Sequence, residues 1–417
     1  MDPLIIVPLV IVVALFFDFT NGFHDTANAM ATPIATGAMK PKTAVAVAAV
    51  MNLAGAFLST EVSLTISKGM LNDDPEKGGS LLPPEIIFAA LTGAILWNLV
   101  TWLYGLPSSS SHALFGGLIG AAVVAAGINA VHFDKVVEKV LIPALFAPLI
   151  AAAAAALATL TSYVITGRSE AARSKNGIAT GRGKFKVGQI FSSSLLALSH
   201  GTNDAQKTMG IITLALVAGG FANKEDGVQF WVILSAALAI AIGTYTGGWR
   251  IIKTMGSGLS EIRPAQGFAA EISSGATILS SSFLGFALST TQVASGSVIG
   301  SGLGRKGAKV RWNKAGQIVL GWLVTLPASA IVGGISAYLV HTFGVVGLVI
   351  DGVILLVCIW QIFKVSARNK VNHKNVAPSE VEVVAATAIL SPRQVRKAEA
   401  KVAKSAKAAK GKGKGKK

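Results

Sequence analysis

The chain has 417 residues, of which 52% are hydrophobic and only 14% are charged, and its formal net charge is +17. This composition excludes an ordinary soluble domain and indicates a polytopic membrane protein. Most of the positive charge lies from Lys364 onward, in a tail rich in lysine and alanine, so the apolar body gives no reason to expect nucleic-acid binding. The single cysteine, Cys358, excludes a disulfide framework and a cysteine-based metal site.

The chain begins with an apolar run from Leu4 that lacks a basic start and a convincing cleavage site. We therefore expect this run to remain as a first transmembrane helix. Several later runs approach the roughly 20 apolar residues that cross a bilayer. They lie at 43–58, 86–104, 140–165, 228–247, 317–340 and 344–363.

Two of the predicted membrane segments are interrupted by polar residues. The stretches 16–32, FFDFTNGFHDTANAMAT, and 198–210, LSHGTNDAQKTMG, place Gly, Asn, His and Asp inside apolar sequence. We expect each to be a broken transmembrane helix, whose freed backbone groups and polar side chains face a site near mid-membrane.

Two further polar stretches each lie between two apolar arms. Residues 107–112 (PSSSSH) divide a segment that runs from Glu85 to about Val131, and residues 289–292 (STTQ) divide the segment 265–304. The pattern predicts two re-entrant helical hairpins with these stretches at their tips.

The short loops predict the orientation, because cytoplasmic loops of membrane proteins are enriched in Lys and Arg. The connections at 39–42 and 168–186 are basic and are expected inside, whereas the acidic loop 71–79 is expected outside. This assignment gives about seven crossings, and it places the N-terminus outside and the C-terminal tail in the cytoplasm. It indicates a multi-pass protein of the cell membrane.

The polar stretches also reveal an internal duplication. Residues 22–30 pair with 201–209, and 109–112 pair with 289–292 at nearly the same separation. An odd number of predicted crossings separates the two copies, so we expect an all-α polytopic membrane protein with two inverted-topology repeats. The predicted divisions are a first repeat at 1–167, a basic cytoplasmic linker at 168–186, a second repeat with extra helices at 187–364, and a disordered basic cytoplasmic tail at 365–417.

The hairpin tips carry hydroxyl groups at predicted helix starts. Ser and Thr are good N-caps, and a helix N-terminus presents unpaired N–H groups together with the positive end of the helix dipole. Two such tips that converge at mid-depth would suit a tetrahedral oxyanion. Hydroxyl runs can instead bond to their own helices or join neighbouring helices, but the symmetric pair favours the anion site. The candidate anion-binding residues are Ser109, Ser110, Ser111, Ser289, Thr290 and Thr291.

The two interrupted helices each carry an acid, Asp25 and Asp204. A carboxylate at the bilayer centre costs at least ~2.5–3.5 kcal/mol, and such residues usually mark ion or proton pathways. Beside an anion both acids must be neutralised, so the anion and a coupling cation are expected to move together. Asn28 and Asn203 offer carbonyl ligands for that cation, and Lys207 can pair with an Asp or touch the anion. A buried Asp–Lys pair that only joins two helices would explain Lys207 but not Asp25.

Three further residues are candidates for a proton relay: His24, His112 and Glu271. The unperturbed pKa of histidine lies near neutrality, and an intramembrane Glu is rare without a role. Hydrogen bonds that hold a helix or hairpin together stay open as the alternative for all three, and His200 is a similar case. We expect no metal held by protein ligands alone.

Four motifs, in order along the chain, resemble the paired signatures of the inorganic phosphate transporter (PiT) family. They are NGFHDTANAMAT (21–32), GLPSSSSHALFGG (105–117), HGTNDAQKTMG (200–210) and LSTTQVASG (288–296), and the GFHDTAN form is similar to the bacterial low-affinity branch. The resemblance covers about 4–364 and leaves out the tail.

The resemblance implies a phosphate symporter with inverted repeats. By motif position, the two Asp and two Asn residues would serve the coupling ion and the tip hydroxyls would hold phosphate. Many members have His where this chain has Gln292, which puts a proton role there in doubt. Members use H⁺ or Na⁺, and some bacterial members carry phosphate with a divalent metal; the form of the first motif favours H⁺. The expected partners are phosphate and membrane lipids, a homo-oligomer stays open, and no cofactor is expected.

Two other functions stay open at this point. A serine hydrolase that uses His112 is disfavoured, because four consecutive serines do not single out one nucleophile and the second copy lacks the histidine. A channel for anions, or a carrier of another oxyanion such as sulfate, would use the same dipoles and hydroxyls.

Overall fold

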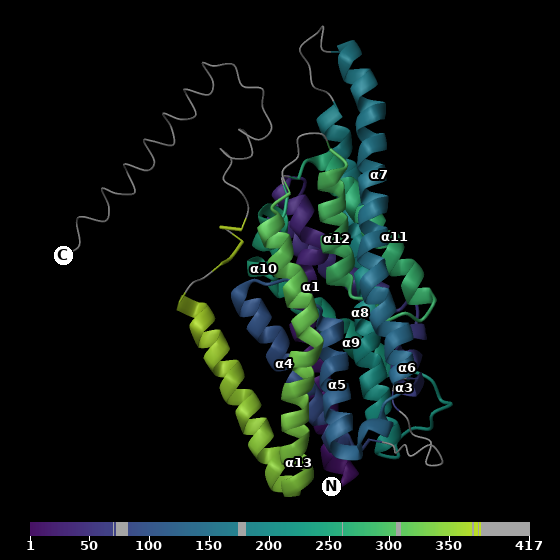
Figure 1. The fold of residues 1–417 in the computed structure, drawn as a ribbon, viewed down its shortest axis with the longest axis vertical. Coiled ribbons are helices and arrows are strands. Elements are labelled where there is room, and N and C mark those ends of the chain that lie inside the picture. The colour runs from purple at the N-terminus through teal and green to yellow at the C-terminus, as the bar shows by residue number, and fades with distance from the viewer. Residues whose placement is uncertain are drawn as a thin grey trace, which may run out of the picture.

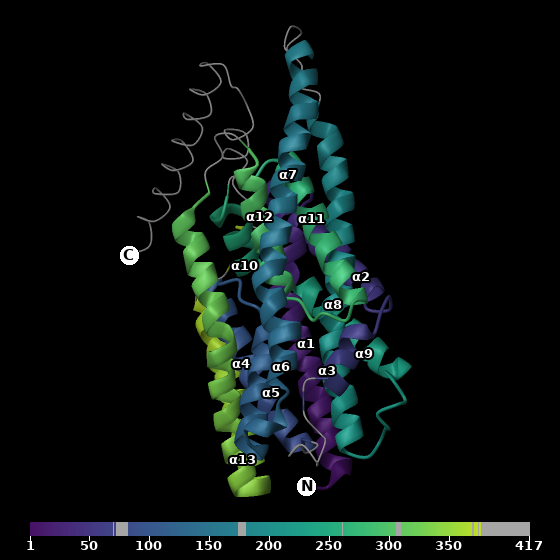
Figure 2. The ribbon, with the colours of Figure 1, turned by 45° about the vertical axis from the view of Figure 1, so that its right-hand side comes forward.

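The structure is a computed structural model that describes residues 1–69, 71, 82–173, 181–260, 262–305, 310–368, 371–373 and 375–376. Within these ranges every regular element is a helix, and the only β contacts are two isolated bridges, Leu71 with Val131 and Ser260 with Val310. The all-helical prediction is confirmed. Figures 1 and 2 show an elongated bundle with the N-terminus at one end, and α7 reaches furthest at the opposite end.

The α-helices are α1 (Pro3–Ala35), α2 (Pro41–Gly55), α3 (Glu61–Gly69), α4 (Pro84–Tyr104), α5 (Ser110–Ala126), α6 (Phe133–Val136), α7 (Ile142–Arg173), α8 (Gly181–Ala218), α9 (Phe230–Thr246), α10 (Trp249–Lys253), α11 (Pro264–Phe283), α12 (Thr290–Leu303) and α13 (Trp312–Arg368). A 3₁₀ turn, η2 (Ile128–Ala130), and two π-helical turns, η3 (Val137–Leu141) and η5 (Thr254–Gly258), complete the described elements.

Among the residues that the structure describes, four helical segments are long and apolar enough to cross a membrane: α1, α4, 133–164 and α13. The pair α9 and α10, bent by 57°, would make a fifth. Gly344 has φ 56° and ψ −128°, a left-handed conformation that glycine adopts without strain, and it turns α13 into two arms that diverge from one end of the bundle (Figure 1). The apolar runs 317–340 and 344–363 are these two arms. The count of about seven crossings stays a prediction.

The outward faces of α7 and α13 are apolar. Large hydrophobic side chains exposed there fit a lipid-facing surface rather than a water-facing one. They include Leu145, Leu149, Ile150 and Leu157 on α7, and Leu320, Leu323, Ile331, Ile335 and Leu356 on α13.

The predicted helix breaks at 16–32 and 198–210 are wrong, because α1 and α8 run without interruption through both motifs. The glycines in these motifs serve helix packing instead. A Cβ on Gly22 would lie 2.4 Å from the carbonyl oxygen of Ile240, and one on Gly201 would lie 2.2 Å from that of Asn52. The two acids of these motifs find hydrogen-bond partners on other helices, Asp25 from Ser110 and Asp204 from Thr290, within unbroken helices.

The breaks occur at the two predicted tips. Helices α4 and α5 are separated by a loop at 105–109, and α11 and α12 by a loop at 284–289. Gly105, with φ 66°, ends α4 in the left-handed conformation. Whether each hairpin returns to the membrane face it left stays a prediction.

The two hairpins pack in matching ways. A Cβ on Gly120 of α5 would lie 2.0 Å from the carbonyl oxygen of Ala330 in α13, and one on Gly300 of α12 would lie 2.0 Å from that of Ala152 in α7. These glycines occupy paired positions in the duplicated motifs, so the contacts support the predicted duplication.

The predicted linker and tail lie partly outside the described residues. Within 168–186, α7 continues to Arg173 and α8 begins at Gly181. In the tail, nothing after residue 376 is described. The divisions into repeats, linker and tail stay predictions.

Candidate functional site

The two tips form the same local structure. The Ser109 hydroxyl caps α5 by accepting a hydrogen bond from the backbone N–H of His112 at 3.1 Å, and the Ser289 hydroxyl caps α12 by accepting from that of Gln292 at 3.3 Å. The predicted N-caps are therefore confirmed. An N-cap satisfies only part of a helix start, so each tip still offers backbone N–H groups that lack an intrahelical partner.

The tips touch each other in the buried interior. The Ser111 hydroxyl donates to the carbonyl oxygen of Leu288 at 3.0 Å, and the Gln292 amide nitrogen lies 3.4 Å from His112 Nδ1. The positive ends of α5 and α12 therefore share one buried region, as the convergent-tip prediction requires.

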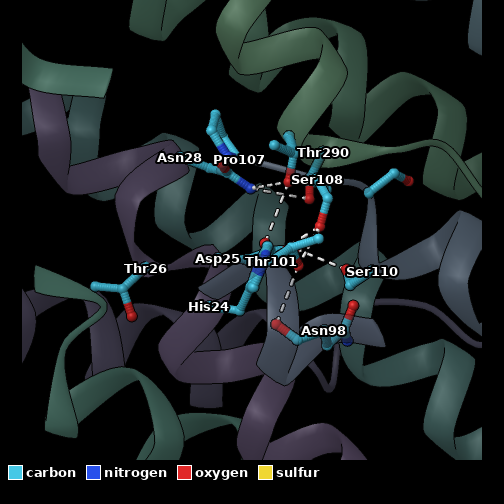
Figure 3. A network of polar contacts seen from close by, with 12 residues as sticks. His24, Asp25, Thr26, Asn28, Asn98, Thr101, Pro107, Ser108, Ser110 and Thr290 are labelled. Carbon is cyan, nitrogen blue, oxygen red and sulfur yellow. Dashed lines mark hydrogen bonds and ion pairs between the residues drawn. The ribbon is translucent and has the colours of Figure 1, made fainter. Parts of the chain in front are cut away.

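Asp25, on α1, lies against both tips. Its Oδ2 accepts from the Ser110 hydroxyl at 2.8 Å, and its Oδ1 accepts from the Thr291 hydroxyl at 3.2 Å. The His24 Nδ1 lies 2.6 Å from Oδ1. Figure 3 shows Asp25 between its helix and the tip residues.

Asp204, on α8, has a related environment. Its Oδ2 accepts from the Thr290 hydroxyl at 3.1 Å and lies 2.9 Å from His200 Nε2. Lys207 donates to Oδ1 and also to the Leu288 carbonyl oxygen at 3.2 Å. Each acid therefore contacts one histidine and at least one tip hydroxyl, but only Asp204 has a fixed cation.

Three amide oxygens at the site, those of Asn28, Asn203 and Gln292, have no hydrogen-bond partner within the described part of the chain. The Asn28 nitrogen donates to the hydroxyls of Thr290 and Thr291 at 3.2 and 3.1 Å, which leaves its Oδ1 unused. The Asn203 nitrogen donates to the Ser282 hydroxyl at 2.9 Å, and its Oδ1 is likewise unused. Carbonyl oxygens of this kind can coordinate a hard cation.

One cluster could hold a cation directly. Asp25, His200 and Asp204 each place one ligand atom within 4.8 Å of the others, and all three residues are buried. The expectation that protein ligands alone hold no metal stays untested.

Not every candidate residue lies at this centre. Glu271 belongs to a separate buried cluster, where it accepts hydrogen bonds from Thr32, from Gln189 at 3.0 Å and from Ser192. Those three partners are different from the groups that bond to Asp25 and Asp204.

Sequence reasoning missed two residues that join the site. The Thr101 and Ser108 hydroxyls each lie 3.3 Å from His24 Nε2, and Ser108 donates to Thr101 at 2.7 Å (Figure 3). Ser108 stands in the predicted tip run. Thr101 could hardly be predicted, because in the sequence it is a single hydroxyl residue within an apolar segment.

A buried centre with two acids, a lysine and converging helix starts, inside a bundle of apolar helices, defines a membrane transporter rather than an enzyme. A family model described as the phosphate transporter family matches residues 21–333. The chain belongs to the phosphate transporter family, so the resemblance of its motifs is confirmed and the serine hydrolase alternative falls.

Several proteins that are similar in sequence to this chain carry the name "Probable low-affinity inorganic phosphate transporter". One from Mycobacterium leprae is 51% identical over 370 residues, covering 88% of this chain and 86% of the relative. Another from Bacillus subtilis is 40% identical over 345 residues, covering 82% and 99%. A solved structure titled "The sodium-dependent phosphate transporter" has a TM-score of 0.68 and 24% identity, covering 82% of this chain and all of that one, and it shows that the two share a fold.

Proposed function

We propose that this phosphate transporter is a secondary active symporter that imports inorganic phosphate together with H⁺. The observation that carries the proposal is the pairing of each buried acid with an imidazole and with a tip hydroxyl, because that arrangement links proton binding to anion binding.

In this mechanism the tip groups bind phosphate. The hydroxyls of Ser110, Thr290 and Thr291 donate to the two carboxylates in the structure. When the acids take up protons, their negative charge disappears and the hydroxyls become free to donate to phosphate instead. The backbone N–H groups of both helix starts complete the anion site, with Ser109, Ser111 and Ser289 shaping the tips.

The protons reach the acids through the two histidines. His24 and His200 contact Asp25 and Asp204, and imidazole exchanges protons near neutral pH. Lys207 offsets one of the two negative charges permanently, so at least one mobile proton is needed before an anion can enter without repulsion.

A second candidate is coupling to Na⁺. It is favoured by the unused amide oxygens of Asn28 and Asn203, which with the carboxylates offer oxygen ligands for a metal cation. The neighbour of known structure is named as sodium-dependent. Phosphate carried with a divalent cation is a third form of the cargo, since the metal would offset the charge of the anion.

Uptake of radiolabelled phosphate into proteoliposomes tests these proposals. With the pH gradient alone we expect accumulation, with a Na⁺ gradient alone none, and added Mg²⁺ should leave the rate unchanged. Accumulation that requires Na⁺, or that requires Mg²⁺, would replace H⁺ coupling with the corresponding alternative. Arsenate should compete and sulfate should not.

Two variants test the role of the acids. Asp25→Asn and Asp204→Asn should each abolish gradient-driven uptake, whereas Asp351→Asn should not. Asp351, in α13, is a matched control because it is also a buried Asp, but it accepts a hydrogen bond from Thr92 of α4 at 2.9 Å rather than from a tip residue. Normal uptake in both acid variants would refute the mechanism.

We also propose that the protein lies in the plasma membrane. In the proposed orientation the N-terminus is outside the cell and the C-terminal tail is in the cytoplasm. The N-terminus and the far end of α7 lie at opposite ends of the bundle, which agrees with the loop charges (Figure 1). Protease added to inside-out vesicles should remove the tail, and protease added to right-side-out vesicles should leave it intact.

A further inference from the structure

A second acid lies buried on the same face of α1 as Asp25. Positions 18, 21, 25 and 28 follow the spacing of three and four residues that aligns side chains along one face of a helix. Asp18 and Asn21 therefore extend the polar face of Asp25 and Asn28 toward the N-terminus, and both are fully buried. Asp18 lies about two turns, or roughly 10 Å along the axis, from Asp25.

The polar atoms around Asp18 face one another without a well-formed hydrogen bond. The Asp18 carboxylate, the Asn21 amide and the Thr208 hydroxyl form no hydrogen bond of normal geometry among the residues that the structure describes, although Asn21 and Thr208 lie close enough to act on the carboxylate. Thr208, on α8, and Asn21 are the polar groups that face the Asp18 carboxylate. The charged groups within electrostatic reach are Lys207 and Asp204, also on α8.

Lys207 does not serve Asp18 as a partner. Its ammonium group already donates to Asp204 and to the Leu288 carbonyl oxygen. A buried carboxylate without a counter-charge in direct contact is strongly disfavoured. Asp18 therefore needs a proton or a metal cation of its own.

The available ligand atoms fit a small hard cation. Asp18 supplies two oxygens, and Asn21 and Thr208 can supply one each, all from side chains of two adjacent helices. Oxygen ligands of this kind suit a proton shared among them or a bound Na⁺.

We propose that Asp18, Asn21 and Thr208 form a second site for a monovalent cation, separate from the one between Asp25 and Asp204. The position has no counterpart in the other half of the chain, because the residue paired with Asp18 in the duplication is Ala197. The existence of this cation site does not depend on the proposed symport. Only its role in coupling rests on that proposal, because a coupling cation would have to move together with phosphate.

Cation binding to the purified full-length protein, without phosphate, tests the site. For Na⁺ the probe is equilibrium dialysis with ²²Na⁺, and for a proton it is the infrared carbonyl band of a protonated carboxylic acid, recorded over a pH titration. In Asp18→Asn we expect the loss of one bound Na⁺ per chain or of one protonated-acid band. Asp351→Asn should keep the Asp18 signal.

Two further variants test whether the bound cation or proton belongs to the Asp18 site. Thr208→Val preserves the shape of the side chain, and it should weaken Na⁺ binding at least tenfold if the ligand is Na⁺ while leaving the acid band in place if the ligand is a proton. The signal that depends on Asp18 should persist when Asp25 and Asp204 are both replaced by Asn. That outcome would support the second site even if proton-driven uptake failed in the unaltered protein.

The proposal is overturned if folded Asp18→Asn binds as much ²²Na⁺ as the unaltered chain and also keeps every acid band. Folding is checked by elution as a single species and by an unchanged far-ultraviolet circular dichroism spectrum.

Discussion

At the scale of single residues, the two central acids are similar but not equivalent. Asp25 accepts hydroxyl hydrogen bonds from both tips, whereas Asp204 accepts from one tip and pairs with Lys207. The negative charge of Asp204 is thus offset by Lys207. The negative charge of Asp25 has to be offset by a proton on His24 or by a mobile cation. This difference can be tested one residue at a time.

Replacing Lys207 should reveal the buried ion pair. Lys207→Met should destabilise the protein by about 3–5 kcal/mol, because it leaves the Asp204 charge uncompensated. Adding Asp204→Asn to this variant should restore most of the stability while phosphate uptake stays absent. Thermal unfolding of the purified protein measures the stability, and equal midpoints for the single and double variants would contradict the pairing.

Replacing His24 should separate binding from coupling. His24→Gln removes the imidazole that contacts Asp25 but keeps a polar group there. We expect proton-driven uptake to fall at least about tenfold, an effect of about 1.4 kcal/mol, with phosphate binding nearly unchanged. His132→Gln, at a partly exposed loop histidine, is the control. A parallel loss of binding and uptake would make His24 a phosphate ligand instead.

At the scale of the elements, helix packing rather than helix breakage positions the site. Sequence reasoning located the two motifs because polar residues in apolar runs are costly and the pattern occurs twice. It misjudged the backbone, because a glycine such as Gly22 is compatible both with a break and with close packing. Only the neighbouring helix, here α9 at Ile240, decides between them.

The paired glycines of the hairpins should behave alike. Gly120→Ala and Gly300→Ala each place a Cβ against a backbone carbonyl oxygen that cannot move without shifting a helix. Each should cost about 1–3 kcal/mol of unfolding free energy. Gly321→Ala, which has open space around it, should be neutral or slightly stabilising. A neutral result at only one of the paired positions would argue against equivalent packing of the two halves.

At the scale of the whole molecule, α1 brings three buried acids into one row: it carries Asp18 and Asp25, and its Thr32 contacts Glu271. Asp18 lies on the N-terminal side of Asp25, and Thr32 on the other side donates to Glu271. The chain therefore has buried acidic groups both at the central site and to either side of it along this helix. Such a series suits the stepwise movement of a proton or cation through a low-dielectric interior.

Glu271 should matter for transport without binding phosphate. Glu271→Gln keeps the size of the side chain but cannot exchange a proton, so uptake should slow while equilibrium phosphate binding stays within about twofold, less than about 0.4 kcal/mol. Filter binding and uptake on the same preparation separate these effects. Loss of binding in this variant would place Glu271 in the phosphate site.

The site residues that the sequence predicts are those in motifs that occur in both halves of the chain. Asp25, Asp204 and the tip residues are predictable because each has a counterpart in the duplication. Thr101 joins the site from another helix, and Asp18 has only Ala197 as its counterpart, so a search for repeated motifs passes over both. Contacts of this kind depend on tertiary structure, which no local pattern records.

One substitution between the two halves has a consequence for the transport cycle: Lys207 stands where the first half has Asn28. In the proposed symport cycle, the Lys207 ammonium group stays beside Asp204 after the cargo leaves, so the charge of Asp204 remains compensated while the empty carrier reorients. Asp25 has no lysine partner among the described residues. We therefore expect the reorientation of the empty carrier to depend on whether Asp25 holds a proton or cation, and this step would set how fast the next turnover can begin.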